Sequence, residues 1–478
     1  MQPRPQPARS DWRARLRRLA AVAGTLATAQ FPLSAGAATT AGPVPSLAWG
    51  VPFLGLLLSI AVLPGLFPRF WTRRMAWIAL VWSLAFLGPL AVQAGPSAAA
   101  AAAWHALLIE YLPFATLLLA LYTTGGGVLL QGGPAGTPRG NTLMLALGLA
   151  LGLVMGTTGA AIVLIQPLLH ANAHRRRKVH LVVFVVVLVA NAAGALSPLG
   201  NPPRYVGLLR GVPFFWPAEH LVAPFLLVSA VLLAVFYLLD RRLAAREPPA
   251  PARQPLRLRG RGNVALILLV VATVAAQGLV HPGSVTLMRQ PIAGERLAAI
   301  IIFIAVTEIS LRFTPRAIRQ ANDFVWHPMA EVATLFAGIF ITIAPVGAML
   351  QAGLQGPLAP LLRLTLDTGG QPVPLVYFWL SGLLSAFLDN APTYLVFFDL
   401  AGIHADALGG ASARVLTAIS AGATFFGGLT YIGNAPNLML RSIAAHRGVR
   451  MPGFFGFVLL AGTLLLPVFV LLTLVFFM

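Results

Sequence analysis

The chain has 478 residues, of which 58% are hydrophobic and only 10% carry a charge. A soluble domain carries about 25% charged residues, so this composition excludes a water-soluble globular protein and indicates a membrane domain. Lys and Arg number 33 against 13 Asp and Glu, and there is no cysteine, which excludes disulfides, thiolate nucleophiles and cysteine-ligated metals.

The N-terminal segment, residues 1–40, has the order of features found in secretory signal peptides. Six arginines lie in residues 1–18, an apolar stretch runs to about residue 33, and a run of small residues follows. A retained first membrane helix is the alternative. We expect a signal-peptide-like segment, because these residues have no counterpart in the internal repeat described below.

Ten apolar stretches are long enough to cross about 30 Å of hydrocarbon at ~1.5 Å per residue. They cover residues 50–67, 76–94, 105–130, 181–210, 221–239, 264–281, 297–313, 330–352, 413–440 and 453–477. Two further stretches, 141–169 and 375–400, are interrupted in the middle by Gly156–Gly159 and Asp389–Pro392. Such interruptions favour hairpins that enter and leave the membrane on one side.

The distribution of basic residues supports this topology. Lys and Arg number 21 in six loops, whereas the loops on the opposite side hold only Arg289, Arg296 and Arg363. The basic loops are 68–75, 131–140, 171–180, 241–262, 312–320 and 441–450. By the positive-inside rule they are cytoplasmic, 241–262 is a basic cytoplasmic linker, and the C-terminus lies outside. The formal net charge of +20 is then mainly a topology signal, and nucleic-acid binding is not expected.

The chain also repeats itself. Gly194–Pro203 and Gly427–Pro436 align without a gap, 233 positions apart, and share the pattern G-[AG]-L-[ST]-x-[LI]-G-N-x-P. Each half, 50–240 and 263–478, then holds five transmembrane helices and one re-entrant hairpin, with broken helices at 181–210 and 413–440. Five crossings are an odd number, so the second half is inverted. The pattern predicts an all-α polytopic membrane protein, an inverted-repeat transporter.

The interruptions predict binding sites, since unwound backbone in a membrane is tolerated where it lines a cavity. Carbonyl, hydroxyl and amide oxygens suit Na⁺, and half-helix N-termini suit an anion. One predicted site comprises Thr157, Thr158, Gly159, Ser197, Gly200 and Asn201, and its counterpart comprises Asp389, Asn390, Thr393, Thr430, Gly433 and Asn434. The expected Na⁺ ligands are Ser197, Asn201, Asp389, Thr430 and Asn434. The alternative is that the Gly/Pro/Asn pattern only shapes kinks and close helix packing.

Asp389 is the expected proton-coupling residue, because ionisable groups inside membranes are functional by default. A proton and a cation would compete for its carboxylate; the alternative is a structural acid that pairs with local amides. Glu308, inside 297–313, is a second candidate proton carrier or else a helix–helix hydrogen-bonding residue.

Other polar residues receive weaker interpretations. Arg204 follows the first broken segment and would attract an anion or extend to a membrane interface. His170, His174 and His180 flank an arginine cluster and indicate membrane-surface residues rather than metal ligands.

The sequence resembles the ion transporter superfamily, and within it the branch of citrate transporters and D-type sodium:proton antiporters. The resemblance runs from about residue 50 to the end, through NAAGALSPLGNPP, SAFLDNAPTYLVFF and GGLTYIGNAPN. It implies a homodimer in which a scaffold region forms the dimer interface and a mobile transport region moves like an elevator. Thr157 and Asn390 match the Ser-Asn-Thr tips of the anion symporters, and 197–201 and 430–434 match the unwound segments that complete sodium sites.

Two departures from that pattern bear on the substrate. Asp389 resembles the acidic tip of the antiporters and should repel a carboxylate substrate. The acid of the antiporters' first broken helix is missing, with Gly200 and Asn201 in its place.

We therefore expect a secondary transporter of the bacterial inner membrane that exchanges sodium for protons. The alternative is sodium- or proton-coupled uptake of citrate or a similar di- or tricarboxylate. An enzyme is not expected, since the sequence contains no H-E-x-x-H, G-x-S-x-G or P-loop motif. No cofactor is expected beyond Na⁺ as the transported or coupling ion.

Overall fold

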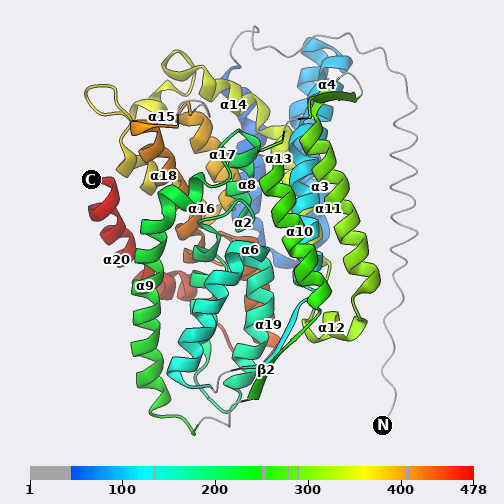
Figure 1. Cartoon of the computed structure of the whole chain (residues 1–478). Helices are drawn as coiled ribbons and strands as arrows, with labels where there is room; N and C mark the ends of the chain where they lie inside the picture. The colour runs from blue at the N-terminus through cyan, green and yellow to red at the C-terminus, as the bar shows by residue number, and fades with distance from the viewer. Residues whose placement is uncertain are drawn as a thin grey trace.

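The computed structural model describes residues 45–133, 136–249, 254–277, 279–280, 282–287, 290–403 and 408–478. The predicted signal-like segment, residues 1–40, lies outside them. The described chain is a mostly helical membrane protein (Figure 1).

The first half contains three leading helical segments, a long paired helix, a broken stretch and a final helix. The leading segments are α2 (Val51–Leu66), α3 (Pro68–Ala94) and α4 (Pro96–His105), which continues through a π-helical turn, η2 (Ala106–Tyr111), into α5 (Leu112–Gly125). The others are α6 (Pro138–Ala171), α7 (Val179–Phe184), η3 (Val185–Val189), η4 (Ala192–Gly194), α8 (Pro202–Leu209) and α9 (Trp216–Ala244).

The second half likewise contains leading helices, a pair of antiparallel arms, an unwound stretch and a final helix, with further short elements between them. It contains α10 (Arg261–Gln277), α11 (Gly294–Phe313), α12 (Arg316–Ala321), α13 (His327–Thr342), α14 (Ala344–Gln351), η5 (Gly353–Gln355) and α15 (Ala359–Arg363). After them come α16 (Pro374–Phe387), α17 (Asn390–Leu400), α18 (Gly410–Phe425), η7 (Phe426–Leu429), α19 (Ala435–His446), α20 (Phe454–Leu472) and η8 (Thr473–Phe477).

Several details differ from the sequence prediction. Two antiparallel strand pairs, β1 (Leu129–Gly133) with β2 (Gln254–Arg259) and β3 (Ser284–Leu287) with β4 (Gln290–Ala293), show that the loops are not all helical or irregular. The expected loop 95–104 is helical, because its alanine run strongly favours a helix. The expected single span 330–352 bends by 45° between α13 and α14, where Pro345 cannot donate a backbone hydrogen bond to the preceding turn.

Six helices in the described part are long and apolar enough to cross a membrane, or seven if the bent pair α13–α14 is one span. α6 is one of the six by length. Its two ends nevertheless meet, since Asn141 Nδ2 lies 3.1 Å from Asn172 Oδ1. A straight helix would separate residues 31 apart by about 46 Å. α6 therefore folds back on itself at Gly156, whose φ of 76° only glycine adopts readily.

α16 and α17 form a second pair of antiparallel arms, joined by Leu388 and Asp389 in extended conformation. The ring of Tyr377 in the first arm lies 6.4 Å from that of Phe397 in the second. The start of one arm and the end of the other are therefore neighbours, as in α6.

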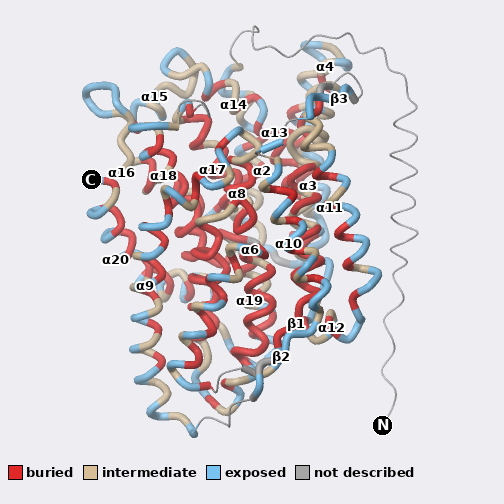
Figure 2. Tube along the Cα trace, viewed as in Figure 1, coloured by how far each residue is buried: buried red, intermediate tan, exposed pale blue. Residues whose placement is uncertain are grey.

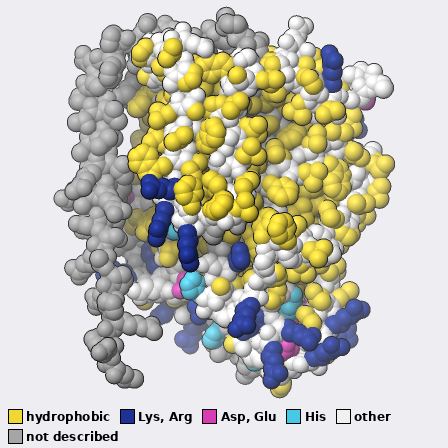
Figure 3. Space-filling view, turned by 180° about the vertical axis from the view of Figure 1, so that it is seen from behind, with side chains coloured by type: hydrophobic (Ala, Val, Ile, Leu, Met, Phe, Trp, Pro, Cys, Tyr) yellow, Lys and Arg dark blue, Asp and Glu magenta, His cyan; other side chains and the backbone are white. Residues whose placement is uncertain are grey.

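Helix packing divides the described chain into two groups. One group comprises α2, α3, α5, α10, α11, α13 and α14, and the other comprises α6, α8, α9, α16, α17, α18, α19 and α20. The two groups meet where α5 contacts α6, α14 contacts α17 and α13 contacts α19. Burial is concentrated in the paired and broken helices (Figure 2). The molecular surface carries broad apolar areas, with Lys and Arg side chains gathered mainly toward one end (Figure 3).

Candidate functional site

Four half-helix N-termini gather in the centre of the molecule. They are the second arm of α6 from Thr157, α8 from Pro202, α17 from Asn390 and α19 from Ala435. Thr157 N–H donates to Gly200 O at 2.9 Å, and Asn390 Nδ2 donates to Asn201 Oδ1 at 2.9 Å. Each N-terminus directs the partial positive charge of its helix dipole toward the centre.

The glycines of the repeated motif explain how the unwound segments fold. A Cβ on Gly200 would lie 2.8 Å from the Cα of Gly194, and one on Gly433 would lie 2.8 Å from the carbonyl oxygen of Gly427. In both halves the first and last glycine of G-[AG]-L-[ST]-x-[LI]-G are thus pressed together. The motif closes a compact backbone loop that a side chain would force open.

Two adjoining cavities reach this centre. The inner one, about 70 Å³, lies against the hairpin tips and the unwound segments. The outer one, about 840 Å³, shares with it a wall that includes Tyr122, Phe336 and Asp389. The outer cavity extends to the exposed residues His327 and His446. It therefore opens toward the end where the sequence places the cytoplasmic loops.

Six of the twelve predicted site residues line the inner cavity. They are Thr157, Thr158, Gly159, Gly200, Asp389 and Asn434. They come from both predicted sets, so the structure brings the two sets to one shared cavity. Its remaining wall is mostly apolar and includes Leu121, Met155, Pro328 and Met439.

The other predicted residues lie behind that wall. The Thr430 hydroxyl accepts hydrogen bonds from the N–H groups of Ile432 and Gly433 and donates to Ala386 O. The Ser197 hydroxyl accepts from Leu199 N–H at 3.1 Å. As arranged, these two hydroxyls hold the unwound backbone. The hydroxyl of Thr393 donates to Asp389 O at 3.2 Å, within the first turn of α17.

Two buried amides, Asn201 and Asn390, each leave one side-chain atom without a hydrogen-bond partner among the described residues. Asn201 and Asn390 are 2% and 0% exposed and bond to each other once. The second side-chain atom of each, Asn201 Nδ2 and Asn390 Oδ1, has no hydrogen-bond partner among the described residues. A buried amide without partners is costly, about 1–3 kcal/mol for each group. The pair therefore holds one unpaired acceptor and one unpaired donor beside the hairpin tip, although neither residue lines the inner or the outer cavity.

Asp389 is the N-cap of α17, and its carboxylate accepts from Ala391 N–H at 3.4 Å. Among the described residues that line the inner cavity, it is the one with a formal charge. Asn434 lines the same cavity while its Nδ2 donates to Ala190 O and Asn191 Oδ1. The side-chain oxygen of Asn434, Oδ1, is therefore the atom that this residue can offer to a bound ion. In the described chain no three His, Asp or Glu side chains cluster as a transition-metal site would require.

The second predicted proton carrier, Glu308, is not part of either cavity. Glu308 is exposed on the outer face of α11, whereas Phe303, Val306 and Ser310 form the buried face. It lines neither cavity. The expectation that Glu308 is buried is wrong, because hydropathy identifies a span without telling which face of it is internal. Its role as a proton carrier stays a prediction.

Comparison with known proteins agrees with this architecture. Residues 43–477 match the family model described as "Putative citrate transport". The chain belongs to this family. A "46 kDa membrane protein" of Mycobacterium leprae is 27% identical over 277 residues, which cover 55% of this chain and 59% of the relative. An "Uncharacterized transporter" of Mycobacterium tuberculosis is 26% identical over 280 residues, with the same two coverages. The chain thus spans less than two thirds of these relatives.

These matches confirm the expected citrate-transporter branch. The structure contradicts one of the two sequence interpretations of Arg204, that its side chain extends to a membrane interface. Arg204, in the first turn of α8, is only 3% exposed and does not extend to an interface. Its Nε donates to Ala195 O, and its Nη2 donates to Ser420 O and Thr424 Oγ1. A lone arginine in an apolar sequence gives no sign of whether it points inward.

A second missed group joins the two broken helices. Asn191 Nδ2 donates to Asn437 Oδ1 at 3.0 Å, while Arg204 bonds Thr424. Asn437 lies 233 positions after Arg204, and Thr424 lies 233 positions after Asn191. The two cross-contacts therefore connect equivalent positions of the two halves. The shared offset of 233 positions was the sequence feature that could have predicted these contacts.

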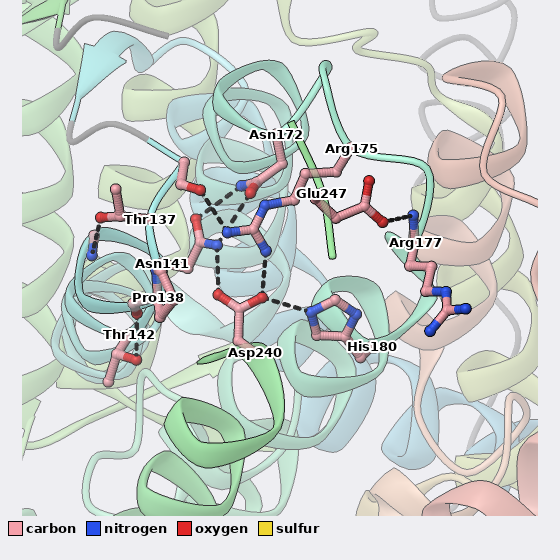
Figure 4. A network of polar contacts seen from close by, with 12 residues as sticks. Thr137, Pro138, Asn141, Thr142, Asn172, Arg175, Arg177, His180, Asp240 and Glu247 are labelled. Atoms are coloured by element: carbon pink, nitrogen blue, oxygen red, sulfur yellow. Dashed lines mark hydrogen bonds and ion pairs between the residues drawn. The ribbon is translucent and has the colours of Figure 1, made fainter. Parts of the chain in front are cut away.

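The base of α6 is tied to α9 by a buried polar network (Figure 4). Asp240 accepts from Asn141 Nδ2 at 2.9 Å and pairs with Arg175, and the Nε2 of His180 lies 2.8 Å from its Oδ1. His180 is 8% exposed, so its interpretation as a membrane-surface residue is wrong. Its partner acid lies 60 residues away in the sequence, beyond the reach of local pattern analysis.

Proposed function

We propose that this transporter exchanges Na⁺ for H⁺, with Asp389 as the group that binds each in turn. The observation that carries the proposal is the inner cavity. Its charged lining among the described residues is a single carboxylate, accompanied by hydroxyl and amide oxygens of the Thr157–Thr158 tip and Asn434. Oxygen donors with one negative charge suit a small hard cation.

The size of the electrostatic energies favours a cation over an anion at this site. Two like charges about 4 Å apart repel by about 4 kcal/mol at the effective dielectric constant of ~20 that suits protein sites. One helix N-terminus stabilises an anion by about 0.3–2 kcal/mol. Four N-termini together would offer about 1–8 kcal/mol, so an ionised Asp389 would cancel half or more of their attraction for a carboxylate substrate. Na⁺ meets no such penalty.

Proton-coupled uptake of citrate or a similar carboxylate is the second candidate. The convergence of four half-helix N-termini favours it, as does the description of the family. It requires Asp389 to be protonated whenever the anion is bound. Coupling would then be a symport of proton and anion.

We further propose that the two halves form an inverted repeat and that the group containing α6 and α16–α20 moves like an elevator against the group containing α3 and α11. The repeated element order, the matched glycine pairs and the symmetric cross-contacts of Arg204 and Asn437 support the repeat. A homodimer in a bacterial inner membrane, with its C-terminus in the periplasm, completes this proposal; the one-sided distribution of Lys and Arg supports the orientation.

Asp389→Asn in proteoliposomes tests the proposal. Addition of Na⁺ should dissipate an imposed pH gradient with the wild-type protein, and the variant should give no response above protein-free vesicles. Asp367→Asn, at an exposed loop carboxylate, is the matched control and should exchange normally. Labelled citrate is offered to the same vesicles. Normal exchange by Asp389→Asn, or citrate uptake without any Na⁺ response, would overturn antiport.

A further inference from the structure

A second cleft lies away from the transport cavities, between α7, α9 and α20. Its volume is about 560 Å³, within the ~300–1,000 Å³ typical of ligand sites. Its lining residues fall into a basic set and an apolar set, and none of the transport-site residues takes part. The proposed antiport does not use it.

The basic set lies at one end of the cleft. It consists of Arg176, Arg177 and Lys178, in the segment that leads into α7, and Arg450, in the segment that leads into α20. The nearest acid that interacts with them is Glu247, which accepts the backbone N–H groups of Arg176 and Arg177. Four basic side chains against this one carboxylate leave three positive charges. An anion is therefore the charge complement of this end.

The apolar set runs along the three helices. Each contributes a pair of residues four apart, which lie one above the other on one helix face. The pairs are Val179 and Val183 on α7, Leu239 and Leu243 on α9, and Leu460 and Leu464 on α20. The apolar walls thus begin where the basic set ends and run along the membrane-spanning helices.

We propose that this cleft binds an anionic phospholipid, with the phosphate at the basic set and acyl chains against the apolar pairs. A soluble phosphate compound would leave the apolar walls without a partner, and a zwitterionic lipid would leave the positive charges uncompensated. Basic pockets between membrane helices at the cytoplasmic surface are suited to such headgroups.

Bound lipid would lie next to the network that closes α6. His180 lines the cleft and is in contact with Asp240, which bonds Asn141 at the start of the first arm. A ligand that binds only the folded protein stabilises it. Occupancy should therefore raise the melting temperature by holding α7 and α9 together beside the hairpin base.

The test uses the purified full chain in a neutral detergent, titrated with phosphatidylglycerol or phosphatidylcholine. Binding is measured by native mass spectrometry and melting temperature by intrinsic fluorescence. Phosphatidylglycerol should bind more tightly and raise the melting temperature. The triple variant Arg176→Gln, Arg177→Gln, Lys178→Gln should weaken its binding by about tenfold or more. The matched triple Arg69→Gln, Arg73→Gln, Arg74→Gln removes the same charge from exposed positions of α3 and should change it little.

Two further arms separate the lipid from other anions and from general surface charge. Leu243→Trp fills the apolar part without altering charge and should also weaken phosphatidylglycerol binding, whereas inorganic phosphate should not raise the melting temperature. If the first triple variant does not fold, phosphatidylglycerol binding by Arg450→Gln is compared with that by Arg74→Gln instead. Equal losses in both members of a pair, equal affinity for the two lipids, or full replacement by phosphate would each overturn the proposal.

Discussion

Arg204 is a positive charge held inside the membrane domain without a carboxylate partner among the described residues. Backbone oxygens of Ala195 and Ser420 and the hydroxyl of Thr424 receive its hydrogens, and the ring of Tyr394 lies 5.7 Å from its guanidinium carbon. These acceptors belong to the first unwound segment and to α18. Arg204 therefore ties the two halves together with a geometry that a planar fork of donors can make and a single ammonium cannot.

Replacing Arg204 tests that role. Arg204→Met removes the hydrogen bonds to Ala195 O, Ser420 O and Thr424 Oγ1. A hydrogen bond to a charged group contributes about 1.5–3 kcal/mol, so the melting temperature should fall clearly. Arg204→Lys keeps the charge but reaches fewer acceptors and should fall between wild type and Arg204→Met. Arg414→Met removes an exposed arginine of α18 and is the control. Thermal melts of the purified proteins give the comparison; an Arg204→Met melt equal to that of Arg414→Met would contradict the role.

Among helices and loops, the hairpin tips and unwound segments were the elements that the sequence could predict in place. Gly156 and Asp389 sit at the turns of the two paired helices, and the glycine pairs of the repeated motif close the unwound loops. Glycine and proline act locally, by allowing a left-handed φ or removing a donor. Their consequences can therefore be derived without knowledge of the tertiary packing.

The direction in which a side chain points depends on tertiary packing and could not be predicted from the sequence in the same way. The outward direction of Glu308 and the inward direction of Arg204 and His180 follow from neighbours far away in the sequence. The same holds for the Thr430 hydroxyl, which turns to its own loop and Ala386 instead of the cavity. The residue types predicted that these positions are polar and structurally important. The hydrogen-bond partners of these side chains, however, come from other elements.

The hydrogen bonds between the loop before α7 and Glu247 should make the stability of the protein depend on pH. The backbone N–H of Arg176, and then that of Arg177, donates to Glu247 and lowers the pKa of its carboxyl below the ordinary value. A lowered pKa in the folded state adds stability above the unfolded pKa, and that stability is lost as pH falls through the folded pKa. Glu247→Gln should therefore melt below wild type at pH 7 and converge with it as the pH falls below the lowered pKa of Glu247. Melting curves across this range decide; a constant difference would contradict the prediction.

For the molecule as a whole, the question is what holds the two packed groups together on the side where the outer cavity opens. Asp323, in the loop before α13, receives a hydrogen bond from Gln166 Nε2 of α6 at 2.6 Å and lies 3.5 Å from Arg447 Nη2 after α19. Its φ of 51° is the left-handed conformation that Asp tolerates better than most residues. The ion pair is about half exposed on both sides, and such pairs contribute about 0–1 kcal/mol. The hydrogen bond from Gln166 to the Asp323 carboxylate adds about 1.5–3 kcal/mol, so the whole contact is small enough to be made and broken in each transport cycle.

The absence of cysteine from the sequence makes this contact testable without background. Gln166→Cys with Asp323→Cys places two thiols at side chains that touch, one from each group. If the groups must slide past one another, joining these thiols with a short bifunctional thiosulfonate should stop Na⁺-driven proton movement in proteoliposomes, and a reductant should restore it. Trp379→Cys with Thr473→Cys joins α16 to η8 within one group, where the native side chains lie 3.0 Å apart, and should leave exchange intact when linked. Full exchange by the linked 166–323 pair would show that the two groups do not separate at this contact, and the elevator motion would have to be abandoned.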